Sequence, residues 1–423
     1  MTIGLYAWQS AAQTKYDRRP EPRFDSCRNR SAHDIPARTT SSLSNLSLTI
    51  RGPACLSSIM STEERGEHSV ARIARISPRL DLLSPINDLW VKDKTIVITG
   101  GAGGLGEGFF KRWAAAGANV IIGDISVDKG SRLVHDVSRQ TGNEHLHFFR
   151  CDVTDWQSQV QFFQKAVEHS PHRGIDCVVA NAGISDKQRS FEEPQGLDKL
   201  NPPEPSLQVM DVNCTGVLYT THLALFWLQK NPGSTKSKPG NKSSELKRDR
   251  HLLLISSMAG LFPIPSQVQY TASKHALVGI FRGLRGTTFQ HGIRVNMLCP
   301  YYIDTPILNT ASRILLAGGV LSEIGPVVEA ATRFVADPAL VGKAVTIGPK
   351  GNIKVGEDGQ WDIVDAPAGH ETKVMELYAD DYKEVELSVR RIVKALNHVE
   401  QTRGWIGWSV DIIKALRYSI TGP

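Results

Sequence analysis

The 423-residue sequence has few cysteines, little excess charge and no long apolar run. Its six cysteines are scattered and form no C-x-x-C pair, which argues against a disulfide framework or a zinc site and favours a reducing compartment. The net charge of +6 lies largely in segments that we interpret as loops or tails, so we do not expect nucleic-acid binding. No apolar run approaches the roughly 18 residues of a membrane-spanning helix. The composition is otherwise that of an ordinary globular protein, and the chain is long enough to form a large core. We expect no metal site.

Ser, Arg and Pro are frequent in residues 1–89, where apolar residues show little periodicity. We therefore predict that most of this extension is disordered. Transit peptides are also rich in Arg and Ser, but they are poor in acids, and this extension contains acids such as Asp17 and Glu21. Two interpretations stay open: a targeting segment, or a true start at Met60. We expect a cytoplasmic protein, with mitochondrial targeting as the alternative.

Strand-like and helix-like segments alternate from about residue 90 onward. Strands are predicted at 94–98, 119–124, 146–150, 175–179, 252–255, 293–298 and 344–347, and helices at 109–116, 128–140, 155–169, 206–230 and 270–290. This alternation predicts an α/β fold over residues 90–350, a single doubly wound (Rossmann) parallel sheet with helices on both faces. We expect loops at 185–205 and, as an insertion, at 231–250. The tail 351–423 is expected to be partly helical, with a helix at 371–400.

A glycine-rich turn follows the first predicted strand. Thr99 precedes three glycines in the spacing Gly-x-x-x-Gly-x-Gly, and the turn comprises Thr99, Gly100, Gly104, Leu105 and Gly106. Glycines here allow backbone angles and a close approach that a Cβ would block. The N-terminus of the helix that follows attracts a pyrophosphate. A strand before, a helix after and an acid at the end of the next strand together indicate a dinucleotide site.

That acid is Asp124, twenty residues after Gly104. A carboxylate at this point accepts hydrogen bonds from ribose hydroxyls and repels a 2′-phosphate. No Arg or Lys lies in the glycine turn to bind such a phosphate. The pattern therefore predicts NAD as the cofactor in preference to NADP. In the alternative, Asp124 only caps the helix that begins near Ser126.

Tyr270 and Lys274 lie four residues apart in the predicted helix 270–290, so they share one face, one turn apart. An ammonium beside a phenol favours the phenolate and lowers its pKa, which makes the tyrosine a usable base. Ser257 lies thirteen residues before Tyr270, just after the apolar run 252–255. By itself the Tyr-x-x-x-Lys spacing is weak evidence, because it also occurs on solvated helix faces. The dinucleotide pattern upstream gives it weight.

Over about residues 91–348 the sequence resembles the classical short-chain dehydrogenase/reductase family. The resemblance is carried in chain order by Thr99-Gly100-x-x-x-Gly104-x-Gly106, Asp152-Val153, Asn181-Ala182-Gly183, Asn213, Ser257, Tyr270-x-x-x-Lys274 and Pro300 with Thr305. Within the family, residues 270–275 and 296–300 are similar in style to fungal relatives of NAD-dependent 15-hydroxyprostaglandin dehydrogenase.

The resemblance implies a catalytic group of four residues. Ser257 would hydrogen-bond the substrate oxygen, and Tyr270 would exchange a proton with it. Lys274 would hold the nicotinamide ribose and lower the pKa of Tyr270. Asn213 would bind a water that relays protons to Lys274, although it could also be an ordinary polar residue of a helix. Ser256 competes with Ser257, and the spacing to the tyrosine favours Ser257.

The resemblance also implies a set of cofactor contacts outside the glycine turn. They are Asp152 and Val153 at the adenine, Asn181, Ala182 and Gly183 near the adenosine ribose and central strand, and Pro300 to Thr305 beside the nicotinamide. Two of these have simpler explanations, because Asp152 could cap the helix that opens near residue 155 and Thr305 could cap a following helix. Tyr301 departs from the family, which usually has glycine after the proline.

Taken together, these residues predict an oxidoreductase that transfers a hydride between NAD and a secondary alcohol or ketone. Substrate contacts are expected from 185–205 and 301–324, and the many Ile and Leu residues of 301–324 favour a hydrophobic alcohol such as a lipid, steroid, polyketide or terpenoid. In the alternative, these side chains only pack lid helices.

Three other functions stay open. They are an NADP-dependent ketone reductase of secondary metabolism, a non-catalytic dinucleotide-binding regulator, and a membrane-surface or scaffold protein that uses the basic loop and the tail. The tail segment 405–418 has an apolar stripe that either packs on protein or lies on a membrane. The family resemblance also implies a homo-oligomer.

Overall fold

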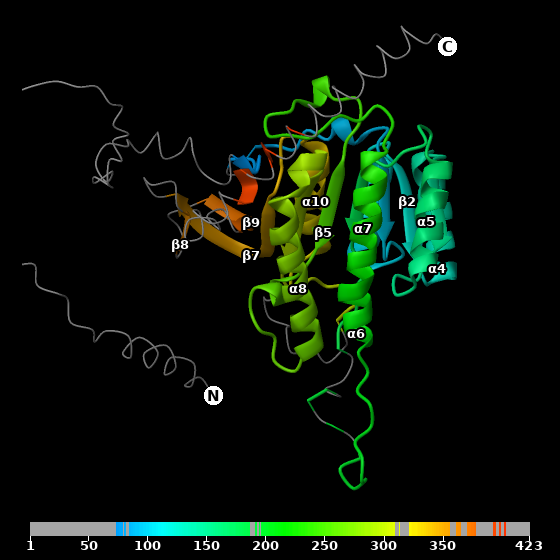
Figure 1. The fold of residues 1–423 in the computed structure, drawn as a ribbon, viewed down its shortest axis with the longest axis vertical. Helices are drawn as coiled ribbons and strands as arrows, with labels where there is room; N and C mark the ends of the chain where they lie inside the picture. The colour runs from blue at the N-terminus through cyan, green and yellow to red at the C-terminus, as the bar shows by residue number, and fades with distance from the viewer. Residues whose placement is uncertain are drawn as a thin grey trace, which may run out of the picture. The chain divides into compact units, whose positions relative to one another are not determined.

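The computed structural model describes residues 73–78, 80–81, 84–186, 191–192, 194, 196–308, 313, 321–355, 361–364, 370–377, 392–394, 397–398 and 402. Within this part of the chain, nine strands form one sheet (Figure 1). The strands are β1 (Thr95–Thr99), β2 (Asn119–Asp124), β3 (Leu146–Arg150), β4 (Cys177–Ala180), β5 (His251–Ile255), β6 (Arg294–Pro300), β7 (Ala344–Val355), β8 (Trp361–Val364) and β9 (His370–Leu377). The helices are α3 (Gly104–Ala115), α4 (Val127–Thr141), α5 (Trp156–His169), α6 (Gln208–Met210), α7 (Gly216–Gln229), α8 (Val268–Arg285) and α10 (Ile324–Ala336).

The strands are ordered β3-β2-β1-β4-β5-β6-β7-β8, and β9 also pairs with β7. Strands β1 to β7 are parallel, so that Val97 of β1 lies opposite Ile121 of β2 on one side and Val178 of β4 on the other. The order reverses between β1 and β4, and in such sheets the reversal opens a crevice at the carboxyl ends of the strands. The predicted doubly wound parallel sheet is confirmed.

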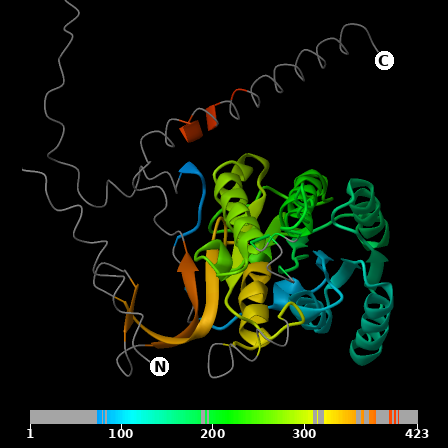
Figure 2. The ribbon, with the colours of Figure 1, turned by 90° about the horizontal axis from the view of Figure 1, so that it is seen from below.

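Both faces of the sheet are covered by helices. Alternate residues of a strand point to opposite faces, so Ile96 and Ile98 enter a cluster with side chains of α3 and α10, whereas Val97 enters a cluster with α5, α7 and α8. Figure 2 shows the green helices α7 and α8 on one side of the sheet and the yellow helix α10 on the other. Burial on both faces explains why these strands are continuous apolar runs in the sequence.

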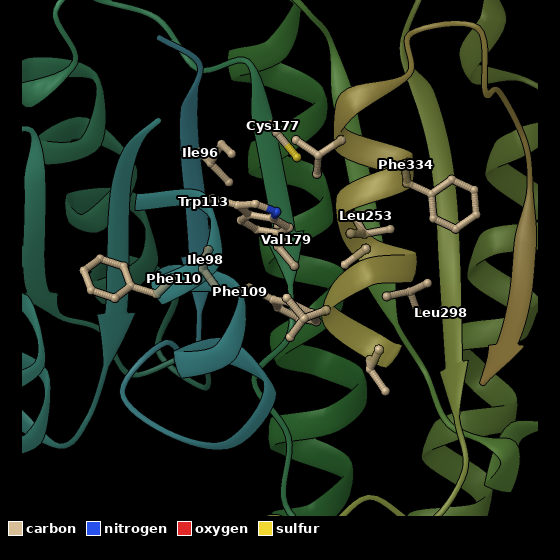
Figure 3. Close-up of a cluster of buried hydrophobic side chains, with 14 of the residues drawn as sticks. Ile96, Ile98, Phe109, Phe110, Trp113, Cys177, Val179, Leu253, Leu298 and Phe334 are labelled. Carbon is tan, nitrogen blue, oxygen red and sulfur yellow. The ribbon is translucent and has the colours of Figure 1, made fainter. Parts of the chain in front are cut away.

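The cluster under α3 anchors the turn from which this helix starts. Figure 3 shows Phe109 and Trp113 of α3 among side chains of β1, β4 and β5, with Phe334 of α10 nearby. The Trp113 ring stacks on Phe109 with centroids 5.2 Å apart, and its indole nitrogen donates a hydrogen bond to Thr332 Oγ1 at 3.0 Å. The start of α3 is therefore held in place by core packing of the helix and not by the glycine turn alone.

The C-terminal part of the sheet differs from the prediction. The strand predicted at 344–347 is not the last one, because β7 continues to Val355 and pairs with two antiparallel strands, β8 and β9. Residues 371–377 lie in β9, so a helix over all of 371–400 is wrong, although 392–394 and 397–398 are helical. Without β9 the backbone groups of β7 would form an open sheet edge, and pairing with that edge overrides local helix propensity. The apolar stripe predicted at 405–418 lies outside the described residues.

Two segments, the extension 1–89 and the insertion 231–250, were predicted to lack regular structure for most of their length. Most of the extension 1–89 lies outside the described residues, but within its described part Leu80 is buried and Ser77 Oγ donates a hydrogen bond to Val341 O at 2.8 Å. The insertion 231–250 is a loop with one short 3-10 turn, Ser243–Glu245, and it is tied to the domain by the buried residues Asn231 and Asp249. No helix in the described part of the chain is long and apolar enough to cross a membrane.

Candidate active site

The predicted site residues follow the carboxyl ends of four adjacent parallel strands. Thr99 ends β1, Asn181 follows β4, Ser257 follows β5 and Pro300 ends β6. In a parallel sheet these ends meet at one edge, and the strand order reverses between β1 and β4 at this same edge. The fold therefore brings together residues that lie up to 201 positions apart in the chain.

The glycine turn after β1 has the backbone that its sequence predicts. Gly100 and Gly104 have φ of +66° and +55°, a region that residues with a Cβ rarely adopt. A Cβ on Gly100 would lie 2.7 Å from Ala182 Cα, so the turn packs directly on the segment after β4. A Cβ on Gly103, in contrast, would meet nothing within 4 Å. The turn thus leaves open space at the start of α3, where backbone N–H groups favour an anion, and the residues present fit a dinucleotide pyrophosphate.

Asn181 braces this turn from β4. Its amide nitrogen donates hydrogen bonds to Thr99 O at 3.0 Å and to Gly100 O at 2.9 Å. The Thr99 hydroxyl in turn accepts from the backbone nitrogens of Asn181 and Ala182 at 3.2 and 3.3 Å. The structure thus brings the predicted residues of β1 and β4 together in one hydrogen-bonded unit.

Asp124 lies beside the glycine turn, as predicted. Its carboxylate accepts hydrogen bonds from Ala102 N at 3.1 Å and from Ser126 N at 2.9 Å. The N-cap position of α4 is occupied by Ser126, so Asp124 precedes the helix and does not cap it. A carboxylate has about four acceptor positions, so this one keeps capacity for two ligand hydroxyls.

Asp152 and Val153 follow β3. The Asp152 carboxylate accepts from Thr154 N at 3.0 Å and from its hydroxyl at 2.7 Å. The cap of α5 is Asp155, which accepts from Ser158 N at 2.9 Å, so the capping alternative for Asp152 is wrong. Val153 is buried against α7.

Ser257, Tyr270 and Lys274 are assembled at the ends of β5 and α8. The Lys274 ammonium is buried, lies 5.6 Å from the centroid of the Tyr270 ring and donates a hydrogen bond to Ile255 O at 3.1 Å. The Ser257 hydroxyl donates to Pro300 O at 3.5 Å and accepts from Ala259 N at 3.1 Å, and its proximity to the Tyr270 phenol lowers the pKa of that group. The competing serine, Ser256, instead donates to Lys274 O at 3.0 Å on the buried side. The predicted choice of Ser257 agrees with this geometry.

The titration of these groups differs from the expectation. Burial raises the pKa of Tyr270, the nearby Ser257 hydroxyl lowers it by a lesser amount, and the phenol of Tyr302 raises it again. Burial also lowers the pKa of Lys274 to about 8. The predicted lowering of the Tyr270 pKa by Lys274 is therefore wrong for this structure. The physical reason is that burial removes water from the phenol, which disfavours the phenolate, while the Lys274 ammonium donates its hydrogen bond to Ile255 O.

Asn213 lies in a π-helical turn, Asp211–Thr215, between α6 and α7. Its side chain is fully buried and holds the backbone of Ile184, accepting from the nitrogen and donating to the oxygen at 2.8 Å each. It also donates to Ser273 Oγ at 3.1 Å. A Cβ on Gly183 would lie 3.4 Å from Asn213 Oδ1 and 3.5 Å from Lys274 Nζ, so both side chains border the same glycine. The amide is thus a structural brace as well as a neighbour of the lysine.

The segment after β6 lies over the glycine turn. A Cβ on Gly104 would be 3.6 Å from Thr305 Cβ, so Thr305 faces that turn. Its hydroxyl donates to Ile303 O at 3.4 Å and residues 306–308 form a turn, so Thr305 caps no helix there. The unusual Tyr301 packs edge-to-face on Tyr302, with ring centroids 5.0 Å apart.

Sequence reasoning missed three residues at this site. Tyr302 was not singled out, and only its place next to Tyr301 could have drawn attention to it. Asp186 and Gln267 were also missed; they are hydrogen-bonded to each other and lie at the start of α8. Their contact spans 81 positions, and a single sequence gives no signal for it.

Comparisons with known proteins agree with this geometry. The family model described as short chain dehydrogenase matches residues 94–314. The chain is 33% identical to 5'-hydroxyaverantin dehydrogenase of Dothistroma septosporum over 63% of this chain and 88% of the relative. It is 26% identical to 15-hydroxyprostaglandin dehydrogenase [NAD(+)] of Bos taurus, over 59% and 84%, and 30% identical to NADP-dependent dehydrogenase M3 of a Phoma species, over 60% and 74%. This chain therefore belongs to the short chain dehydrogenase family, as the resemblance predicted.

Proposed function

We propose that this chain oxidises a secondary alcohol of a hydrophobic molecule to the ketone, with NAD as cofactor. Family membership gives the coarser part, an oxidoreductase that acts on hydroxyl or ketone substrates. The observation that carries the proposal is the assembly of Ser257, Tyr270 and Lys274 beside the glycine turn.

In the proposed reaction the bound dinucleotide supplies the hydride acceptor, and the chain moves the proton. Ser257 donates a hydrogen bond to the substrate oxygen and aligns it with Tyr270. Tyr270 takes the hydroxyl proton as the carbon–hydrogen bond breaks, which avoids an unstable charged intermediate. Lys274 has a pKa of about 8, so its amine can pass a proton onward near neutral pH.

The preference for NAD rests on Asp124. Its carboxylate is fixed at the glycine turn and would repel a 2′-phosphate, and Ile125 beside it offers no cation to bind one. Relatives are named for both cofactors, so NADP-dependent ketone reduction is the second candidate. We expect Asp124→Ala to lower the ratio of kcat/KM for NAD over NADP at least about tenfold. Asp128→Ala, which changes an acid of the first turn of α4, is the matched control. An unchanged ratio in Asp124→Ala contradicts the assignment.

The hydrophobic substrate is supported by where large apolar side chains are exposed. Seven of them lie on three segments: one between β4 and α7, one from the end of β5 to the start of α8, and one after β6. They are Phe191, Leu197, Leu200 and Leu207 on the first, Phe262 and Val268 on the second, and Ile307 on the third. These segments are joined to one another, because Ser185 Oγ donates to Ile307 O at 3.1 Å and Asp186 is bonded to Gln267. Exposed apolar groups on segments that are joined beside the site favour an apolar ligand.

The substrate class can be tested with a panel of secondary alcohols. The full chain and NAD are mixed with each alcohol, and NADH formation is followed by absorbance. We expect higher kcat/KM for alcohols on apolar ring or chain systems than for small polyols. A panel that favours polyols overturns the substrate class but leaves the reaction type intact, whereas no turnover with any alcohol favours a non-catalytic regulator.

We also propose a cytoplasmic homo-oligomer; the four described cysteines are unpaired, as in a reducing compartment.

A further inference from the structure

Asp186 joins the segment after β4 to the first turn of α8. Its carboxylate oxygen Oδ2 accepts a hydrogen bond from the backbone nitrogen of Tyr270 at 3.1 Å. Its own backbone is held by the side-chain amide of Gln267: Asp186 N donates to Gln267 Oε1, and Gln267 Nε2 donates to Asp186 O, at 3.1 Å each. Three hydrogen bonds therefore tie this one residue to the start of the helix that carries Tyr270.

The N-terminus of α8 has no cap of its own. The first backbone N–H groups of any helix lack partners within it, and they are usually satisfied by a side chain at the N-cap. In α8 the N-cap residue is Gln267, its side chain makes no capping bond, and the first turn contains no acid. Tyr270 is the third residue of the helix, so its N–H is one of these unpaired donors. Asp186 supplies the missing acceptor and a negative charge from 84 positions away.

The other backbone group of Tyr270 is also held. Tyr270 O accepts from Ser273 Oγ at 2.8 Å, and Ser273 Oγ accepts from Asn213 Nδ2 at 3.1 Å. Asn213 in turn holds both backbone groups of Ile184, two residues before Asp186. The contacts thus form a closed circuit that runs from Asp186 through Tyr270, Ser273, Asn213 and Ile184 and back.

We propose that Asp186 is a positioning residue that fixes Tyr270 along the axis of α8, in register with Ser257 and Lys274. This inference rests on the proposed dehydrogenase function. Asp186 does not touch the reacting atoms; it acts through the backbone of Tyr270. Because reactive groups must lie within a few tenths of an ångström of the productive geometry, a small slide of this turn costs turnover without costing cofactor binding.

The test compares Asp186→Ala, which removes the acceptor, with Asp186→Asn, which keeps an uncharged one. Glu144→Ala, which removes an exposed acid between α4 and β3, away from the segments expected to bind substrate, is the matched control. We expect Asp186→Ala to lower kcat by about 10- to 100-fold, with the Kd for NAD changed less than about twofold. Asp186→Asn should restore kcat to within about threefold of the wild-type value, and Glu144→Ala should match the wild type.

Two further readouts separate positioning from a general structural role. In Asp186→Ala the plateau of kcat/KM for oxidation should be lower, whereas the pH at which it begins should stay at about 8, because Lys274 sets that pH and a displaced Tyr270 changes only the height of the plateau. Hydrogen exchange of the Tyr270 amide, measured on peptides from the start of α8, should speed up in Asp186→Ala and stay slow in Asp186→Asn. Should Asp186→Ala fail to fold, Asp186→Ser, whose side chain is too short to reach, carries the same expectation.

Wild-type kcat in Asp186→Ala, unchanged amide exchange, or an Asp186→Asn variant as slow as Asp186→Ala would each overturn the proposal. The exchange measurement also separates the two ideas. If the wild-type chain oxidises no alcohol but Tyr270 exchange still depends on Asp186, the proposed function fails and the capping role stands.

Discussion

A Cβ placed on Gly106 would lie 2.2 Å from the carbonyl oxygen of Gly100. It would also lie 2.7 Å from the amide nitrogen of Asn181, which braces the same turn. No real Cβ tolerates such distances, and the atoms it would meet are backbone or a bonded amide with nowhere to move. The start of α3 can approach the end of β1 this closely only because residue 106 is glycine.

Gly106→Ala is therefore expected to push α3 away from β1 and to weaken NAD binding at least about tenfold, because the N–H groups that face the pyrophosphate shift with the helix. The control is Gly283→Ala in α8, an exposed glycine outside the glycine turn whose new methyl group would meet nothing within 4 Å. NAD affinity measured by calorimetry checks both variants. Equal affinities for the two variants would contradict this account of the turn.

The pH dependence of the reaction follows from Tyr270 and Lys274. Oxidation needs Tyr270 without its proton and Lys274 with its proton. Burial raises the pKa of Tyr270 and lowers that of Lys274 to about 8, so this combination is a minor form whose fraction rises with pH and levels off at about 8. We expect kcat/KM for oxidation to rise from pH 6 to about 8 and then flatten, and ketone reduction to fall above about 8.

Lys274→Arg is the control for this profile. Arginine keeps its charge throughout the range, so the break at about pH 8 should disappear even if the rate is lower. An oxidation rate that falls between pH 6 and 8 in the wild type would contradict the assignment of these two groups.

A stability prediction concerns the opposite end of the strands, where Asp249 is buried between two cations. Its carboxylate accepts from Lys94 Nζ at 2.6 Å and from Arg294 Nη2 at 2.6 Å. Asp249→Ala leaves both cations buried without their partner and should lower the free energy of unfolding by about 3–5 kcal/mol. Urea denaturation measures this. Glu107→Ala, which breaks the exposed pair with Lys111, should cost less than about 1 kcal/mol.

Asp249 should lose its stabilising effect in acid. Burial alone would raise the pKa of the Asp249 carboxyl, but Arg294 and Lys94 hold it well below its ordinary value. The stabilisation is therefore present above the ordinary pKa of about 4 and is lost as pH falls through the lower folded value. The stability advantage of the wild type over Asp249→Ala should shrink below about pH 4; an advantage that grows with acid would contradict the ion-pair account.

The sequence was enough to predict the parts of the fold that are locally encoded. Parallel strands buried on both faces are continuous apolar runs, and the glycine turn and Asp124 come at fixed distances after such runs, so β1, β2 and α3 could be placed from the pattern. The helix predicted at 270–290 is α8, and it gives Tyr270 and Lys274 the shared face that their spacing predicts.

The parts that could not be predicted depend on contacts between distant positions. β9 forms because β7 offers an edge to pair with, and residues 370–377 alone do not indicate a strand. The cap of α8 comes from Asp186 across 84 positions, and no local pattern at the start of the helix indicates it. The direction of the Tyr270 pKa depends on how much water the fold removes, which residue spacing does not specify.

The most direct test of the central claim, that Tyr270 exchanges the substrate proton, is Tyr270→Phe. This change removes the phenol oxygen but leaves the ring, the capped backbone and Lys274 in place. We expect alcohol oxidation to fall about 10³-fold or more while NAD binds with an affinity within about threefold of the wild type. Wild-type turnover in Tyr270→Phe, measured as NADH formation with the best alcohol of the panel, would contradict the claim.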